Sequence, residues 1–347
     1  MYRDYGPKKV KFFFIYKSLA HPEMRGNYVQ PFTMDERLAH ARQAIKQLGA
    51  TIPWLVDPMD NRLKHALGDR PNSEFVIDPK GIIVRKRAWS DPVALRKDLE
   101  ELVGKVDKIT KPEDLKLKVL DPLPEVAAKG VVERLQRPGM FALVSKPQME
   151  KDGAPFYAKL RPEAEMSVID QGKGKLYLGF HLDPFHQVHW NNLTKPLRFE
   201  ISTPEGVKIS KTTAEAASVK VATDIDPREF MLDVEAWPSG KTITLTVTYA
   251  ACTDKDCHVV KQSYVLHRER DKDGGAAPNS GFRGQTAEAM IKRLMEGDKN
   301  ADGKLSKDEL NSLFQGRMAE FDLNKNGVLD KSEIEKMAEE LAKRKKE

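Results

Sequence analysis

The chain has 347 residues, of which 40% are hydrophobic and 32% are charged, and its formal net charge is +6. This length exceeds one ordinary hydrophobic core, so we expect two or three globular domains. No apolar run approaches the roughly 18 residues that cross a bilayer, and we expect no membrane span. The basic residues at positions 343 to 346 have no accompanying pattern of aromatic residues. We therefore expect a solvated helix end there and no nucleic-acid partner.

Residues 9 to 104 alternate two kinds of segment. The runs VKFFFIY, TIPWLVD, EFVIDPKG and IIVRKRAW are expected as strands, and ERLAHARQAIKQLG and NRLKHALG as helices. A further helix is expected from Asp91, because Asp91 followed by Pro92 is a good helix start and Gly104 a good stop. Such alternation predicts an α/β sheet packed by helices.

The same region carries a sequence of short motifs. FFFIY is followed by AHP at residues 20 to 22, by Arg37 on an expected helix, and then by VDPMDN, Pro71 and FVIDPKG. Over residues 9 to 103 this order resembles the iodothyronine deiodinase-like and redoxin branch of the thioredoxin fold. The resemblance implies a thioredoxin-like domain in which His21 has a catalytic role and Pro71 is the cis-proline beside the active site. The alternatives are a loop histidine bonded to the backbone and a proline that begins a strand.

In that family the catalytic cysteine or selenocysteine lies on the loop between the first strand and the first helix. The stretch between Met1 and Lys9 holds neither residue, so we expect the first strand and the nucleophile loop to be lacking. Without the nucleophile the domain does no thiol or selenol chemistry by itself. No secretory signal is recognisable either. If further residues precede Met1 in the full protein, they would account for the absence of both the nucleophile and the signal. The alternative is a degenerate domain that has lost its nucleophile.

From residue 131 to residue 269 the pattern changes to short runs at regular spacing. The runs are MFALVS, YAKLRPEAEMSVID, KLYLGFHL, LRFEIS, SVKVAT, EFMLDVEAW, TITLTVTYA and VVKQSYVLH. Turn segments such as TPEG and SG separate them. This pattern is typical of an all-β sandwich.

The chain has two cysteines, Cys252 and Cys257, in a turn between two of these expected strands. A hairpin brings such positions within the Cα separation of about 5 to 6 Å that a disulfide requires. The segment YAAC at residues 249 to 252 resembles the disulfide-interchange domain of the DsbD type, an immunoglobulin-like sandwich, although His258 and Val259 replace its usual prolines. The resemblance implies a catalytic dithiol pair and a thioredoxin-like partner protein. A purely structural disulfide is the alternative.

Metal binding is a further alternative for this region. The segment HLDPFHQVHWNN contains three histidines, and with the cysteines they are candidates for a copper or zinc site: His181, His186 and His189. The alternative is that these histidines pack at a strand end beside Phe185 and Trp190.

Two twelve-residue segments near the C-terminus, DKNADGKLSKDE and DLNKNGVLDKSE, fit the calcium loop of the EF-hand. Gly303 and Gly327 occupy position 6, where the chain turns sharply. Positions 1, 3, 5, 7, 9 and 12 supply oxygen ligands, so we expect two Ca²⁺ ions. The expected ligands are Asp298, Asn300, Asp302, Lys304, Ser306 and Glu309 in the first loop, and Asp322, Asn324, Asn326, Val328, Asp330 and Glu333 in the second.

The loops are separated only by residues 310 to 321, which is one helix of about 18 Å. We expect this helix to be shared, with its apolar side chains on one face: Leu310, Leu313, Phe314, Met318 and Phe321. A shared helix cannot swing separately for each site. This favours a calcium-stabilised module over a sensor that opens a target groove.

The expected architecture is multidomain. It consists of an α/β thioredoxin-like domain (1 to 104), a linker (105 to 130), an all-β immunoglobulin-like sandwich (131 to 269), a flexible linker (270 to 284) and an all-α EF-hand pair (285 to 347). The expected function is calcium binding combined with thiol-disulfide redox chemistry outside the cytoplasm. A non-catalytic calcium-binding scaffold is the alternative, and a deiodinase-like reductase would require the missing nucleophile.

Overall fold

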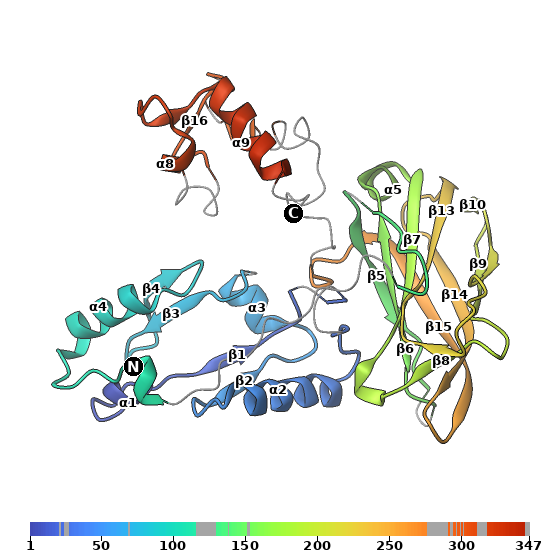
Figure 1. Ribbon diagram of the computed structural model, residues 1–347, viewed down its shortest axis with the longest axis horizontal. Coiled ribbons are helices and arrows are strands. Elements are labelled where there is room, and N and C mark those ends of the chain that lie inside the picture. Colours follow the sequence, from blue (N-terminus) through green and yellow to red (C-terminus); the bar gives the residue numbers. More distant parts are fainter. Residues whose placement is uncertain are drawn as a thin grey trace.

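The computed structural model describes most of the chain (Figure 1). The described residues are 1–20, 22–23, 28–68, 70–115, 130–137, 139–150, 153–275, 291, 294–295, 297–298, 300, 302–310 and 318–343. They form an N-terminal α/β region, a large antiparallel sheet and a small C-terminal region, so the protein is multidomain. Among the described residues, no helix is long and apolar enough to span a membrane.

The N-terminal region begins with a short helix, α1 (Tyr2–Tyr5), followed by a β-α-β unit. Strand β1 (Phe14–Tyr16) lies parallel to β2 (Trp54–Val56), and helix α2 (Met34–Leu48) connects them. A capping box starts α2, because Thr33 Oγ1 accepts from Glu36 N at 3.2 Å and Glu36 Oε2 accepts from Thr33 N at 3.2 Å. Gly49 ends α2 with a φ of 59°, a conformation that suits glycine.

The second half of this region is a helix, a hairpin and a helix. Helix α3 (Arg62–Leu67) precedes the antiparallel pair β3 (Glu74–Ile77) and β4 (Ile83–Arg87). Helix α4 (Pro92–Val103) starts at Asp91, whose Oδ1 accepts from Val93 N and Ala94 N, and the 3₁₀ helix η1 (Pro112–Leu115) follows. Each predicted strand and helix of residues 9 to 104 has a counterpart, although β1 covers only the last three residues of the run VKFFFIY. Strands β1 and β2 form one two-stranded sheet and β3 and β4 form another, so among the described residues the single α/β sheet that the alternation predicted is not formed. No described peptide bond is cis, so Pro71 follows a trans bond, and the cis-proline hypothesis is wrong.

The large sheet contains eleven antiparallel strands, in the spatial order β10-β13-β7-β6-β5-β15-β14-β8-β12, with β9 between β14 and β11. The strands are β5 (Phe141–Pro147), β6 (Ala158–Ala164), β7 (Gly174–Leu182), β8 (His189–Asn191), β9 (Arg198–Ser202), β10 (Lys208–Ile209), β11 (Thr213–Glu215), β12 (Thr223–Asp224), β13 (Arg228–Ala236), β14 (Thr242–Cys252) and β15 (Cys257–Arg270). Strand β5 joins two halves, because its start pairs with β6 and the rest pairs with β15.

The two halves pack face to face around one hydrophobic core. Phe199 of β9 lies against Phe180 of β7, with ring centroids 6.4 Å apart, and against Phe230 of β13, at 4.9 Å. Leu178, Leu232, Leu245, Val247 and Tyr264 belong to the same buried cluster. Alternation of buried and exposed residues along these strands produces a two-layer packing.

Two predicted strands are wrong in part. The run that was expected to continue to Asp170 ends at Ala164, and helix α5 (Met166–Gln171) follows. Gly172 ends that helix with a φ of 75°, a stop signal that the β pattern obscured. Within SVKVAT only Thr223 is in a strand, β12. The 3₁₀ helix η2 (Pro184–His186) lies between β7 and β8.

The outer face of β6 is buried, although its side chains are charged. All seven residues of β6 are buried, including Lys159, Arg161 and Glu163. Lys159 pairs with Glu36 of α2 at 2.8 Å, and Arg161 pairs with Glu23 at 3.0 Å. Phe32 adds an edge-to-face contact with Phe156 at 5.6 Å. The α/β region therefore packs on the large sheet through paired charges.

The start of the expected second linker also takes part in this contact. Asp273 pairs with Lys64 of α3 at 2.5 Å, and its carbonyl accepts from Gln30 Nε2 at 3.2 Å. Gly274 O accepts from Arg161 Nη1 at 2.6 Å. Residues 271 to 275 thus lie between the α/β region and the large sheet. Residues 276 to 290 lie outside the described residues.

Candidate calcium sites and disulfide site

The two C-terminal loops share one hydrogen-bonding pattern. The N–H of the glycine at position 6 donates to the aspartate at position 1, at 2.9 Å for Gly303 and Asp298 and at 3.0 Å for Gly327 and Asp322. The N–H at position 5 donates to the asparagine at position 3, at 3.0 Å in both loops. The φ of Gly303 is 76° and that of Gly327 is 83°. In both loops the backbone therefore wraps around the side-chain oxygen atoms of positions 1 and 3.

The glutamate at position 12 closes each loop. Glu309 Oε2 accepts from Ser306 N at 2.9 Å, and Glu333 Oε2 accepts from Asp330 N at 3.0 Å. Glu333 is buried, and its Oε1 also accepts from Leu323 N at 2.8 Å. Asp330 Oδ1 accepts from Ser332 N at 3.0 Å, at the start of helix α9 (Lys331–Lys343). Hydrogen bonds from Ser332 and Glu333 lower the pKa of Asp330, which keeps it ionised.

The donor set fits Ca²⁺. Each loop offers three carboxylates, together with asparagine oxygens and a backbone carbonyl. These are the hard oxygen ligands that Ca²⁺ prefers, at the spacing that brings them to one point. In the first loop Asn300 and Ser306 accompany Asp298, Asp302 and Glu309, and in the second Asn324 and Asn326 accompany Asp322, Asp330 and Glu333.

A short antiparallel contact joins the loops back to back. Leu305 of β16 (Leu305–Ser306) lies opposite Leu329 of β17 (Val328–Leu329). Both leucines are fully buried. They belong to a cluster formed by Leu294, Leu305, Leu310, Met318, Phe321, Leu329, Ile334 and Met337. The loops therefore share one core, and this strand pair was not predicted.

Of the helix expected between the two loops, the structure describes only the end that leads into the second loop. Helix α8 (Met318–Phe321) leads into the second loop, and its first and last residues, Met318 and Phe321, are buried. Leu313 and Phe314 lie outside the described residues. Leu310, Met318 and Phe321 are in the common cluster, as the one-face pattern predicts.

Cys252 and Cys257 form a disulfide at the tip of the β14–β15 hairpin, with their Cα atoms 4.0 Å apart. They face each other in the strand register. Cys252 is buried and Cys257 is exposed. The turn between them is closed by Thr253, whose N donates to Asp256 O at 2.7 Å. Cys257 is thus the solvent-exposed residue of the pair.

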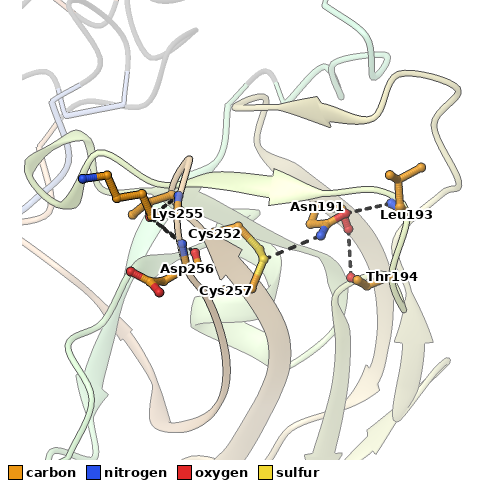
Figure 2. Close-up of a disulfide and its surroundings, with 8 residues drawn as sticks. Asn191, Leu193, Thr194, Cys252, Lys255, Asp256 and Cys257 are labelled. Carbon is orange, nitrogen blue, oxygen red and sulfur yellow. Dashed lines mark hydrogen bonds between the residues drawn. A yellow bond between two sulfur atoms is a disulfide. The ribbon is translucent and has the colours of Figure 1, made fainter.

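Asn191, at the end of β8, reaches the exposed sulfur. Its Nδ2 donates to Cys257 Sγ at 3.6 Å, and Figure 2 shows the two side chains pointing toward each other. Sequence reasoning missed this residue. The contact joins positions 66 residues apart, and nothing in the local pattern of β8 marks it.

The histidines expected at a copper or zinc site are not gathered. His181 is buried in β7, where burial and the charges of Arg137, Arg134 and Arg161 hold its pKa well below its usual value. His186 lies on η2 against Tyr157, at 5.1 Å, and His189 lies opposite Cys252. Among the described residues, no metal-binding group of three contains two of these histidines. The disulfide also removes both thiolates, so this site is not formed.

One different group has metal-like spacing. Possible ligand atoms of Glu36, Asp183 and His186 lie within 4.8 Å of one another. Lys159 Nζ is 2.8 Å from Glu36 Oε2 and 2.7 Å from Asp183 Oδ2. The Lys159 ammonium pairs with both carboxylates and offsets one of their two negative charges, so we interpret the group as an ion cluster that holds α2 against the large sheet. His21, the remaining residue expected to be catalytic, lies outside the described residues.

The comparison with protein families agrees with the C-terminal geometry. The family model described as EF hand matches residues 291–314 and 317–338. No curated protein matches the chain. The match indicates calcium binding and covers only the C-terminal part of the chain.

Proposed function

We propose that the EF-hand pair, residues 285 to 347, binds two Ca²⁺ ions through the twelve predicted ligands. The observation that carries the proposal is the hydrogen-bonding pattern that both loops share, from the aspartate at position 1 to the glutamate at position 12. Each loop brings three carboxylates together, and their repulsion favours a bound cation. The strand pair Leu305–Leu329 connects the sites, so occupation of one loop orders the other.

In this proposal calcium stabilises the region rather than opening it. A ligand that binds only the folded state adds about 2.7 kcal/mol of stability at one hundred times its dissociation constant. Amide hydrogen exchange in the two loops, residues 298 to 309 and 322 to 333, measures this gain. Exchange should slow when calcium replaces a chelator. The Glu309→Gln variant should lose the effect in the first loop, whereas Asp308→Asn, which removes an adjacent acid outside the ligand positions, should keep it.

A second function, thiol-disulfide exchange, is favoured by the exposure of Cys257 beside buried Cys252. In this proposal residues 131 to 269 are an immunoglobulin-like, DsbD-type sandwich, and residues 1 to 104 are thioredoxin-like with no cysteine of their own. The partner is a thioredoxin-like protein, and the location is extracytoplasmic, where disulfides persist. The alternative is a calcium-binding scaffold whose disulfide only closes the hairpin.

Exchange proceeds by attack of a thiolate on a disulfide sulfur. A partner thiolate attacks Cys257 Sγ, a mixed disulfide forms, and Cys252 leaves as a thiolate. A second partner thiol then breaks the mixed disulfide, so two electrons pass to the chain. Incubation of the native protein with reduced thioredoxin, followed by alkylation and mass spectrometry, should show both cysteines alkylated. A pair that stays oxidised in mild reductant and never exchanges would leave only the structural role.

A further inference from the structure

The orientation of the Asn191 side chain is determined by its neighbours. Asn191 Oδ1 accepts from Leu193 N at 3.0 Å. Because a backbone N–H can only donate, the amide oxygen must face Leu193, and the NH₂ group is left to face Cys257 Sγ at 3.6 Å. Thr194 Oγ1 donates to the Asn191 carbonyl at 2.9 Å, which holds the same turn (Figure 2). Two hydrogen bonds within residues 191 to 194 therefore orient the Asn191 Nδ2 donor toward Cys257 Sγ.

Three backbone donors in the hairpin turn are already engaged. The N–H groups of Lys255 and Asp256 both donate to Thr253 Oγ1, at 3.2 and 3.1 Å. The Thr253 N–H donates to Asp256 O. Within the described hairpin and its neighbours, the Asn191 amide is therefore the side-chain donor placed on Cys257 Sγ.

The charged groups around the pair have mixed signs. The turn itself carries Asp254, Lys255 and Asp256, and the segment after β8 carries Lys195. His258 stacks on Tyr157 with centroids 5.4 Å apart, and His189 faces Cys252 in the strand register. On β12, Asp224 is paired with Arg228 at 2.7 Å. The formal charges of these two carboxylates and two ammonium groups sum to zero, and the Asn191 amide is in direct contact with the sulfur.

We infer that Asn191 is the positioning residue of the Cys252–Cys257 pair: in the reduced protein its amide donates to the Cys257 thiolate and makes Cys257 the attacking thiol. This inference rests on the proposed exchange function. A hydrogen bond to an ionised sulfur is stronger than one to a neutral thiol, so the bond favours the thiolate. Cys252 is buried, which disfavours its thiolate, and it acts second.

The reaction balances as follows for a partner disulfide. The Cys257 thiolate attacks one partner sulfur, which breaks the partner's S–S bond, forms a mixed disulfide and releases a partner thiolate. Cys252 then loses its proton and attacks Cys257 Sγ, which restores the bond between Cys252 and Cys257 and releases the second partner thiolate. Two electrons leave the chain, and an external dithiol must reduce the pair again.

The test is the substitution Asn191→Asp. The two side chains have the same shape, and aspartate keeps the acceptor for Leu193 N while it removes the donor to Cys257. In reduced protein, the rate of Cys257 alkylation by iodoacetamide is measured against pH with site-resolved mass spectrometry. We expect the Cys257 pKa to rise by about one unit, which is roughly a tenfold slower alkylation near neutral pH. Oxidation by oxidised thioredoxin should slow in parallel.

The control is Leu193→Asp, which adds the same charge to the same segment at an exposed side chain and keeps both the backbone N–H that binds Asn191 Oδ1 and the Thr194 bond. We expect it to slow alkylation by less than about threefold. Equal slowing of alkylation in both variants would overturn the role of Asn191 and leave the exchange function standing. An unchanged Cys257 pKa in Asn191→Asp, with exchange with thioredoxin still proceeding, would do the same. Absence of exchange in the unsubstituted protein overturns the role of Asn191 together with the proposed exchange function.

Discussion

Replacing Arg161 by methionine tests how the α/β region is held on the large sheet. Arg161 is buried on the outer face of β6, where its Nη1 is 3.0 Å from Glu23 Oε2 and its Nε is 2.5 Å from Glu163 Oε1. Glu163 retains Arg137 at 3.2 Å as a counter-ion in the variant. Glu23 does not retain an ion pair of comparable length among the described residues. The substitution therefore leaves one buried carboxylate without its partner.

The magnitude follows from the chemistry of Glu23. Removal of one partner from a buried ion pair costs about 3 to 5 kcal/mol. The Glu23 carboxylate can avoid part of this penalty by taking up a proton. For a group with an ordinary pKa of about 4.3, protonation at pH 7 costs about 4 kcal/mol. Burial already raises the pKa of Glu23. We expect a loss of about 4 kcal/mol at pH 7 and about 1 kcal/mol at pH 5, where protonation is easier.

The assay is urea-induced unfolding followed by circular dichroism at both pH values. Arg198→Met is the matched control, because Arg198 pairs with Glu200 two residues along a strand, as Arg161 does with Glu163, but in an exposed pair. An exposed pair contributes at most about 1 kcal/mol. A loss below about 1 kcal/mol for Arg161→Met at pH 7, or a loss that grows toward pH 5, would refute the reasoning.

Two further predictions concern the large sheet. Burial lowers the pKa of His181 in the folded state, so below about pH 6.5 only the unfolded chain binds a proton at this residue. The stability of the unsubstituted protein should therefore fall by up to about 1.4 kcal/mol for each pH unit below that value. His181→Gln should remove this part of the pH dependence. An unchanged slope between pH 6.5 and 5 would contradict this. Gly172→Ala should cost about 2 kcal/mol or more in thermal unfolding, because its φ is 75° and an added Cβ would lie 2.3 Å from Trp237 O. Gly240→Ala, at the same φ with open space around it, should cost only about 1 kcal/mol.

Local patterns predicted the elements that local interactions determine. The Thr33–Glu36 capping box and Gly49 delimit α2 within its own sequence. The calcium loops are likewise specified by twelve consecutive residues each, and the pairing of Cys252 with Cys257 needs only a hairpin. Each of these features depends on residues close together in the chain, which is why the sequence alone indicated them.

Features that depend on distant residues were not predicted. Lys159, Arg161 and Glu163 alternate along β6 as solvent-facing residues do, yet they are buried because the α/β region supplies Glu36 and Glu23 as partners. The Asn191 contact with Cys257 depends on how β8 pairs with β14. The apolar residues of Met166–Gln171 satisfied a strand pattern, but α5 ends at Gly172 in a left-handed conformation. In each case tertiary contacts or backbone conformation outweighed the local pattern.

Calorimetric titration of the full chain with Ca²⁺ counts the ions that the two loops bind. We expect two ions per chain for the unsubstituted protein, and one each for Glu309→Gln and Glu333→Gln, since each variant loses the bidentate ligand at position 12 of one loop. Asp308→Asn should still bind two. No calcium binding, or a stoichiometry that Glu309→Gln and Glu333→Gln leave unchanged, would contradict the assignment of the two loops.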